Sequence, residues 1–210
     1  MPPLAHVDAA TASLIRLSAA IAAGDDASIR RAFADTARDG VPSAWTEAVV
    51  LQSYLFCGFP RALNAAREWR RRTPAPPATA AGDDATDYAR GDAWRARGEA
   101  ACAAVYGPMY EKLRDNVSAL HPALDEWMIV EGYGKLLGRP GLDLGRRELC
   151  VVAACAATAQ HRQLHSHLHG SLNVGVSLVA LGEAIDVLEP LIGSETARSV
   201  RLLLARVAGK

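Results

Sequence analysis

The stretch GYGKLLGRPGLDLGRRELCVVAACAATAQHRQLHSHLHGSLNVGVS, residues 132–177, contains the pattern that decides the fold. Its longest apolar run, from Leu149 to Ala159, is interrupted only by Thr158, and a histidine-rich stretch, His161 to Gly170, comes next. A membrane span needs roughly 20 apolar residues, so this run is too short to be one. We therefore predict a buried helix, a short turn and a second, amphipathic helix.

The N-terminal part of the chain repeats this pattern at a constant offset. Asp8 corresponds to Asp143, and 143 minus 8 is 135. The same offset pairs Leu14 with Leu149, Ala19 with Ala154, Gly40 with Gly175, Val41 with Val176, Gly58 with Gly193 and Ala62 with Ala197. An aspartate is a good helix N-cap, and glycine commonly ends helices. The pattern predicts an internal duplication of a three-helix unit.

Outside the repeats, composition suggests where the boundaries lie. The segment TPAPPATAAGDDAT, residues 73–86, combines proline, small residues and aspartate without apolar periodicity, as linkers do. We expect residues 1–72 to form a degenerate N-terminal copy and residues 73–87 a Pro/Ala-rich linker. Residues 88–210 then hold middle helices, broken near Pro108 and Pro122, and the C-terminal copy with the candidate site. The expected fold is all-α, two related three-helix units joined by a helical middle segment.

The overall composition limits the partners. Lysine plus arginine and aspartate plus glutamate both total 23, so no net field attracts the chain to nucleic acid or to an anionic membrane. We expect neither as a partner. The arginines around Trp69 form one basic cluster, which fits either a binding patch or the cations usual at a helix C-terminus. The partners we expect are a small-molecule substrate and further copies of the chain, in a homo-oligomer.

The cysteines predict structural thiols. Cys57, Cys102, Cys150 and Cys155 form neither a CxxC pair nor a metal knuckle and stand in apolar surroundings. Free, buried thiols suit a reducing compartment. The first residues also lack the basic start and apolar stretch of a secretory signal. We expect a cytoplasmic protein.

Helical geometry separates the histidines of residues 161–170. With Gln163 at 0°, His167 lies at about 40°, inside the apolar arc, whereas His165 and His169 lie at about 200° and 240°. A buried imidazole needs a hydrogen-bond partner, and Glu148, near the start of the preceding helix, is the nearest candidate in the sequence. A core histidine bonded to a carbonyl, and a first-turn glutamate favoured by the helix dipole, fit the same pattern. In the first copy Ser13 and Ala32 take these two places, so we expect that copy to be scaffold.

Two further features of this helix have ordinary explanations. His161, His165 and His169 have an i, i+4, i+8 spacing that would align metal ligands, but no second ligand cluster accompanies them. We expect no metal and no other cofactor. Gly170, in mid-helix, indicates the close approach of another helix or of a ligand, and close helix packing is the commoner cause.

Several of these residues resemble the core of the carboxymuconolactone decarboxylase family. They are Arg139-Pro140-Gly141-Leu142-Asp143, Arg147-Glu148-Leu149, and His167, nineteen positions after Glu148. The N-terminal copy resembles the family's trailing helix through Glu47 and CGFPRALNA, residues 57–65. The family shares its all-α fold with alkyl hydroperoxidase D, so the resemblance implies that fold. It also implies that Glu148 and His167 are catalytic, and we expect Gln163, Tyr133, His165 and Arg139 to bind the substrate.

The chain differs from the family pattern at positions that matter for the peroxidase and the decarboxylase activities. In the peroxidase branch a CxxC pair begins the histidine-bearing helix, and here Gln160 and Gln163 occupy those places. Cys150 and Cys155 are separated by about 140° around the preceding helix and do not replace the pair. In the decarboxylase branch an arginine often comes after His-Leu, where this chain has His169.

These observations leave three hypotheses for the function. The first is a decarboxylase-like or isomerase-like lyase, in which His167 and Glu148 transfer protons on a small carboxylated or lactone substrate. The second is a peroxiredoxin or alkyl hydroperoxidase activity, and the missing CxxC pair counts against it. The third is a non-catalytic helical oligomer or small-molecule binder.

Overall fold

The structure, a computed structural model, describes residues 3–73 and 86–209. In these residues the fold is all-α, as expected, and the only β-type contact is an isolated parallel bridge between Leu4 and Val176. The proposed linker, residues 73–87, falls almost entirely outside the described part. Among the described residues no helix is both long and apolar enough to cross a membrane.

The helices before and after the middle segment have corresponding bounds. The first group is α1 (Ala9–Ala23), α2 (Asp26–Arg38) and α3 (Ser43–Arg72), and the second is α7 (Leu144–Ala157), α8 (His161–Asn173), α9 (Leu178–Ile192) and α10 (Ser194–Ala208). Shifted by 135 residues, α2 coincides with α8, and the first residues of α1 and α3 coincide with those of α7 and α9.

Caps and glycines repeat with the helices. Asp8 and Asp143 both cap a helix, since their side chains accept from the backbone N–H groups of Thr11 and Arg146. Gly58 and Gly193 both have a positive φ, 75° and 83°. In each half a further helical stretch comes after this glycine, residues 59–72 and α10, which the expected three-helix unit did not include. An internal duplication remains a prediction, and these bounds support it.

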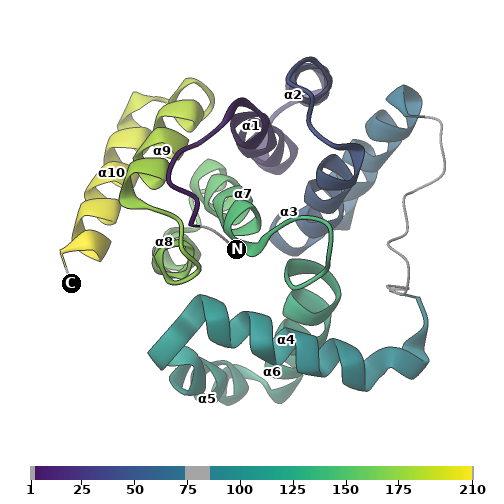
Figure 1. Cartoon of the computed structure of the whole chain (residues 1–210), viewed down its shortest axis with the longest axis vertical. Helices are drawn as coiled ribbons and strands as arrows, with labels where there is room; N and C mark the ends of the chain where they lie inside the picture. The colour runs from purple at the N-terminus through teal and green to yellow at the C-terminus, as the bar shows by residue number, and fades with distance from the viewer. Residues whose placement is uncertain (1–2, 74–85, 210) are drawn as a thin grey trace.

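The two halves meet along α1 and α7, which lie side by side near the middle of Figure 1. Both helices are rich in alanine and almost wholly buried, so their backbones approach closely. The Ser18 hydroxyl donates to the Cys150 carbonyl oxygen over 2.6 Å. The Arg146 guanidinium bonds to Thr11 and to both capping aspartates, Asp8 and Asp143. The helix that carries Glu148 is thereby fixed against the other half.

A buried arginine holds the turn that enters α7. Arg147 is 1% exposed and donates to the carbonyl oxygens of Leu142 and Arg139 and to the side chain of Gln52, over 3.0 to 3.2 Å. Burial lowers its pKa to about 10, which still leaves the side chain a cation at neutral pH. The guanidinium of Arg147 therefore fixes the turn at residues 139–141, because backbone carbonyl oxygens at both ends of the turn accept its hydrogen bonds.

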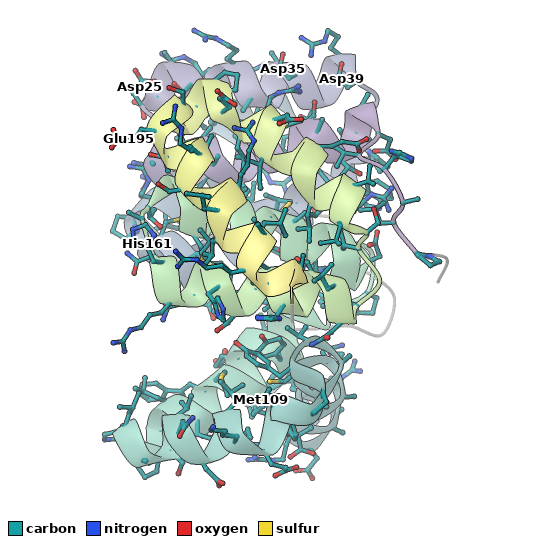
Figure 2. The ribbon with its side chains drawn as sticks, turned by 90° about the vertical axis from the view of Figure 1, so that its left-hand side faces the viewer. Asp25, Asp35, Asp39, Met109, His161 and Glu195 are labelled. Carbon is teal, nitrogen blue, oxygen red and sulfur yellow. The ribbon has the colours of Figure 1, made fainter. Side chains whose placement is uncertain are left out.

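The middle segment forms a lobe of its own, below the other helices in Figure 2. Its elements are η1 (Tyr88–Arg90), α4 (Gly91–Tyr106), η2 (Gly107–Met109), α5 (Tyr110–Leu120), α6 (Pro122–Trp127) and η3 (Met128–Leu137). The breaks fall at Gly107, whose φ is positive, and at Pro122, as the sequence predicts. The lobe packs against α8 through α4.

The last element of this lobe, η3, is a π-helix. Its end is marked by a bond from the Gly138 N–H to the Tyr133 carbonyl oxygen, 2.7 Å long. π-helical segments are rare and often occur at functional sites. Two glycines bring η3 against α4: a Cβ on Gly98 would lie 2.1 Å from the Ile129 carbonyl oxygen, and one on Gly134 would lie 2.3 Å from that of Trp94. Backbone therefore packs on backbone at this crossing.

The close packing of η3 on α4 can be tested by substitution of a glycine. Gly98→Ala should lower the free energy of unfolding by about 1–3 kcal/mol, because the added methyl group meets backbone that cannot yield. The control is Gly182→Ala in α9, where a Cβ would meet nothing within 4 Å. That change should be neutral or should stabilise by up to about 1 kcal/mol, since alanine favours helix. Urea unfolding of the two variants measures both effects, and equal stability would contradict the close crossing.

Candidate active site

The centre of the candidate site is a carboxylate that the solvent does not reach. Glu148 stands in the second turn of α7 and is 0% exposed. The chain then turns at residues 158–160, where Ala159 has a φ of 56°, and α8 returns alongside α7. This brings His167, 6% exposed, beside Glu148, with 2.8 Å between His167 Nδ1 and Glu148 Oε2. The pairing expected from the helical wheel is therefore present in the geometry.

Gly170 makes room for this pair. A Cβ at position 170 would lie 2.5 Å from Val105 Cγ1 and 3.0 Å from Glu148 Oε2. The glycine thus lets α8 approach α4 and the carboxylate at the same time. Close helix packing, the explanation favoured from the sequence, accounts for it.

The chemistry of the pair depends on its hydrogen bonding. The contact joins His167 Nδ1 to Glu148 Oε2, and which atom donates depends on the tautomer of the ring: an ionised carboxylate can only accept, which would require a proton on Nδ1 and leave the lone pair of the neutral ring on Nε2. The other carboxylate oxygen, Oε1, is buried and has no hydrogen-bond partner among the described residues. Burial, and then the neighbouring Glu148 charge, raise the pKa of Tyr106 above its usual range. A negative charge on Glu148 thus disfavours ionisation of the neighbouring Tyr106 hydroxyl.

His167 forms part of the wall of a pocket of about 570 Å³, within the usual range for small-molecule sites. The wall is mostly apolar and aromatic, and its polar members near His167 come from α8 and η3. Its residues are Tyr54, Leu55, Phe56, Tyr106, Leu113, Val117, Leu124, Trp127, Met128, Glu131, Gly132, Tyr133, Leu137, Arg162, Gln163, Ser166 and His167. The phenyl ring of Phe56 meets the His167 ring edge-on, with 5.9 Å between ring centroids.

The structure separates the residues expected to bind substrate. Gln163 and Tyr133 line the pocket that His167 lines. His165 instead lines a neighbouring pocket, with His169. Arg139 lines neither pocket; its carbonyl oxygen accepts a hydrogen bond from Arg147 at the turn into α7.

Most of the pocket wall was not predicted from the sequence. The first half of the chain, expected to be scaffold, contributes Tyr54, Leu55 and Phe56 from α3. These residues are about a hundred positions from His167, and no spacing rule links them to it. Trp127 and Tyr133, at the two ends of a mostly apolar stretch, were the available signal for the π-helix side of the wall.

The cysteines have the character of buried structural thiols. All four are free, and Cys102, Cys150 and Cys155 are buried. Burial raises the pKa of each of these three to about 12, and it also raises the pKa of Cys57. A thiolate is the nucleophilic form, so these thiols are poorly reactive at neutral pH.

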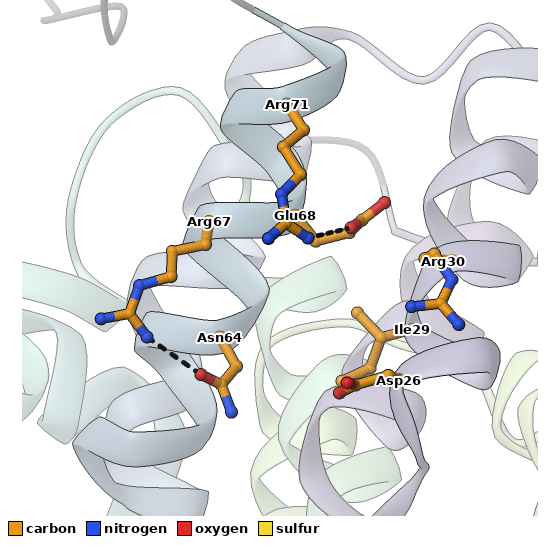
Figure 3. Close-up of a pocket in the computed structure, with 7 residues that line it drawn as sticks. All are labelled: Asp26, Ile29, Arg30, Asn64, Arg67, Glu68 and Arg71. Atoms are coloured by element: carbon orange, nitrogen blue, oxygen red, sulfur yellow. Dashed lines mark hydrogen bonds and ion pairs between the residues drawn. The ribbon is translucent and has the colours of Figure 1, made fainter.

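The arginine cluster near Trp69 is largely neutralised within the fold. Arg71 and Arg72 pair with Glu68, and Arg70 pairs with Glu47. Figure 3 shows the hollow of about 220 Å³ between α2 and α3, where Arg67 bonds to Asn64 and Arg71 to Glu68. Cations at the end of α3 also suit the helix dipole.

The described residues contain no group of three or more histidine, cysteine, aspartate or glutamate side chains that could hold a metal ion. His161, His165 and His169 share one helix, and the ring contact between them joins only His165 and His169. The candidate site itself is an imidazole–carboxylate pair beside a mostly apolar pocket.

Comparison with known proteins supports the family resemblance. Residues 123–206 match the model of the carboxymuconolactone decarboxylase family. This segment runs from α6 to α10, contains both Glu148 and His167, and covers less than half of the chain. A search of curated proteins found no match. The family expectation is confirmed for this segment.

The hydrogen bond to Glu148 predicts the tautomer of His167. In the neutral ring the proton should be on Nδ1, because the carboxylate can only accept it. Long-range ¹H–¹⁵N spectra with histidine-selective labelling report the tautomer, and exposed His161 is the internal control. If His167 shows a protonated Nε2 and a bare Nδ1, the arrangement of the pair is wrong.

Proposed function

We propose that this chain is a lyase or isomerase that transfers a proton at carbon next to a carbonyl group. His167 is the proton carrier and Glu148 orients it. The observation that carries this proposal is the 2.8 Å contact between a fully buried carboxylate and an imidazole that forms part of a pocket wall. General acid–base catalysis needs this combination of a titratable group, a fixed orientation and a place for substrate.

In the proposed step, Nε2 of His167 takes a proton from the substrate carbon, which leaves an enolate and an imidazolium. The Glu148 carboxylate stabilises the imidazolium through Nδ1–H. Return of the proton to another carbon gives isomerisation. If the substrate carries a carboxylate beside the reacting carbon, loss of carbon dioxide also gives an enolate. In that case His167 begins the reaction as an imidazolium and protonates the enolate. Gln163 and Tyr133 are the proposed substrate contacts, to which the pocket adds Arg162.

The geometry does not favour a peroxidase. That chemistry needs a thiolate near a resolving thiol, and burial raises the pKa of three of the four cysteines to about 12. The free thiols instead support a cytoplasmic setting for the protein, where cysteines stay reduced.

Catalysis can be tested before the substrate is known. A panel of small lactones and keto acids in D₂O, monitored by NMR, detects exchange at carbon or loss of carbon dioxide. For any compound that reacts, His167→Gln should lower the rate by about 10² to 10⁴, the usual contribution of general acid–base catalysis. Glu148→Gln should have a similar effect, because it removes the charge that stabilises the imidazolium.

The controls separate the three hypotheses. Replacing all four cysteines with serine should leave most of the activity, apart from packing losses. His161→Gln, on the same helix but exposed, should have no effect. Loss of activity in the cysteine variant with a silent His167→Gln would replace this proposal with thiol chemistry. Compounds that bind the pocket without turnover would favour a non-catalytic binder.

We further propose that the chain assembles into a homo-oligomer. Large apolar side chains remain on its surface: Phe59, Leu120, Trp127 and Leu202 are each more than half exposed. Apolar surface of this kind favours association. Light scattering at micromolar concentration should give a mass of at least two chains, and a monomer mass would contradict the proposal.

A further inference from the structure

A second pocket of about 740 Å³ adjoins the His167 pocket, and the proposed reaction does not use it. Its wall is formed by the end of α4, by η2, by α5 and by the side of α8 that carries His165, Ser166, His169 and Asn173. Tyr106, Leu113 and Ser166 line both pockets, so the two pockets share part of their walls. A ligand there would lie beside the His167 site without occupying it.

The polar side of this pocket can hold a negative charge. Lys112 of α5 lines it, as do His165 and His169, two half-buried residues of α8 whose ring centroids are 4.8 Å apart. No aspartate or glutamate is among the residues that line it in the described part of the chain. Lysine supplies a permanent cation and imidazoles supply N–H donors. The lining of this pocket thus carries one lysine cation and two imidazoles, and no carboxylate among the described residues.

The remaining wall has a different character. Val105, Pro108, Met109 and Leu113 add apolar surface to the lining. The amide of Asn173 is held in place because it donates to the Val105 carbonyl oxygen over 2.8 Å. The lining of the pocket therefore combines basic side chains with apolar surface.

We propose that this pocket binds a small organic monocarboxylate with an apolar chain. The apolar wall accepts the chain, and Lys112 with the two imidazoles binds the carboxylate by charge-assisted hydrogen bonds. Among the described residues Lys112 is the only permanent cation that lines the pocket, so the pocket suits a single negative charge better than a dianionic phosphate. His165, expected from the sequence to contact the reaction's substrate, belongs to this separate site.

Octanoate is the probe, and octanamide is its uncharged match. Isothermal titration calorimetry of the full-length protein should show saturable binding of octanoate and binding of octanamide that is at least about tenfold weaker, as expected for loss of a charge-assisted contact. Lys112→Gln and His169→Gln should each weaken octanoate binding severalfold. His161→Gln, on the same helix but outside the pocket, should bind as the wild type does.

Further variants identify the site. Arg162→Gln and His167→Gln alter the other pocket and should leave octanoate affinity unchanged. Circular dichroism of each variant shows that it is folded. The proposal is overturned if octanoate does not bind, if octanamide binds equally well, or if Lys112→Gln is silent. Loss of binding in Arg162→Gln would place the carboxylate in the His167 pocket, and preferential binding of octyl phosphate would assign a different anion.

Discussion

Burial of the Glu148 carboxylate is the constraint on which the arrangement of this protein depends. A buried carboxylate needs hydrogen-bond partners from the protein, and Glu148 has one in His167, whose Nδ1 lies 2.8 Å from Oε2. That contact requires α7 and α8 to lie close together, and Gly170 provides the space. The bonds of Arg146 and Arg147 fix the start of α7. The other carboxylate oxygen, Oε1, is buried and has no hydrogen-bond partner among the described residues.

The two halves of the chain use the same helices differently. At the positions of Glu148 and His167 the first half has Ser13 and Ala32, and the Ser13 hydroxyl donates to Asp39. In the first half, α1 packs against α7, whereas α3 reaches the pocket and places Phe56 against the His167 ring. The first half therefore shapes a site whose titratable pair belongs to the second. A single copy of the helical unit would lack either the pair or this wall.

Features that depend on local periodicity could be predicted from the sequence. The capping aspartates, the glycine breaks and the inward side of the histidine helix all depend on short-range geometry, and so does the choice of His167 over His165 and His169. The pocket could not be predicted in this way, because residues distant in the chain form it. Phe56 meets His167 only in the folded protein, and the π-helix at residues 128–137 packs closely on α4 through Gly98 and Gly134, which are also distant in the sequence. The contact of the Arg139 carbonyl oxygen with Arg147 likewise depends on the folded turn and has no signal in the local sequence pattern.

The central claim is that Glu148 and His167 act as one unit, and a double-mutant cycle on kcat/KM tests it most directly. Residues that act through one another have effects that do not add. For a compound that the protein turns over, the variant carrying both Glu148→Gln and His167→Gln should be about as slow as His167→Gln alone. If the two losses instead multiply, each residue acts independently, and the account of a carboxylate that serves the imidazole is contradicted.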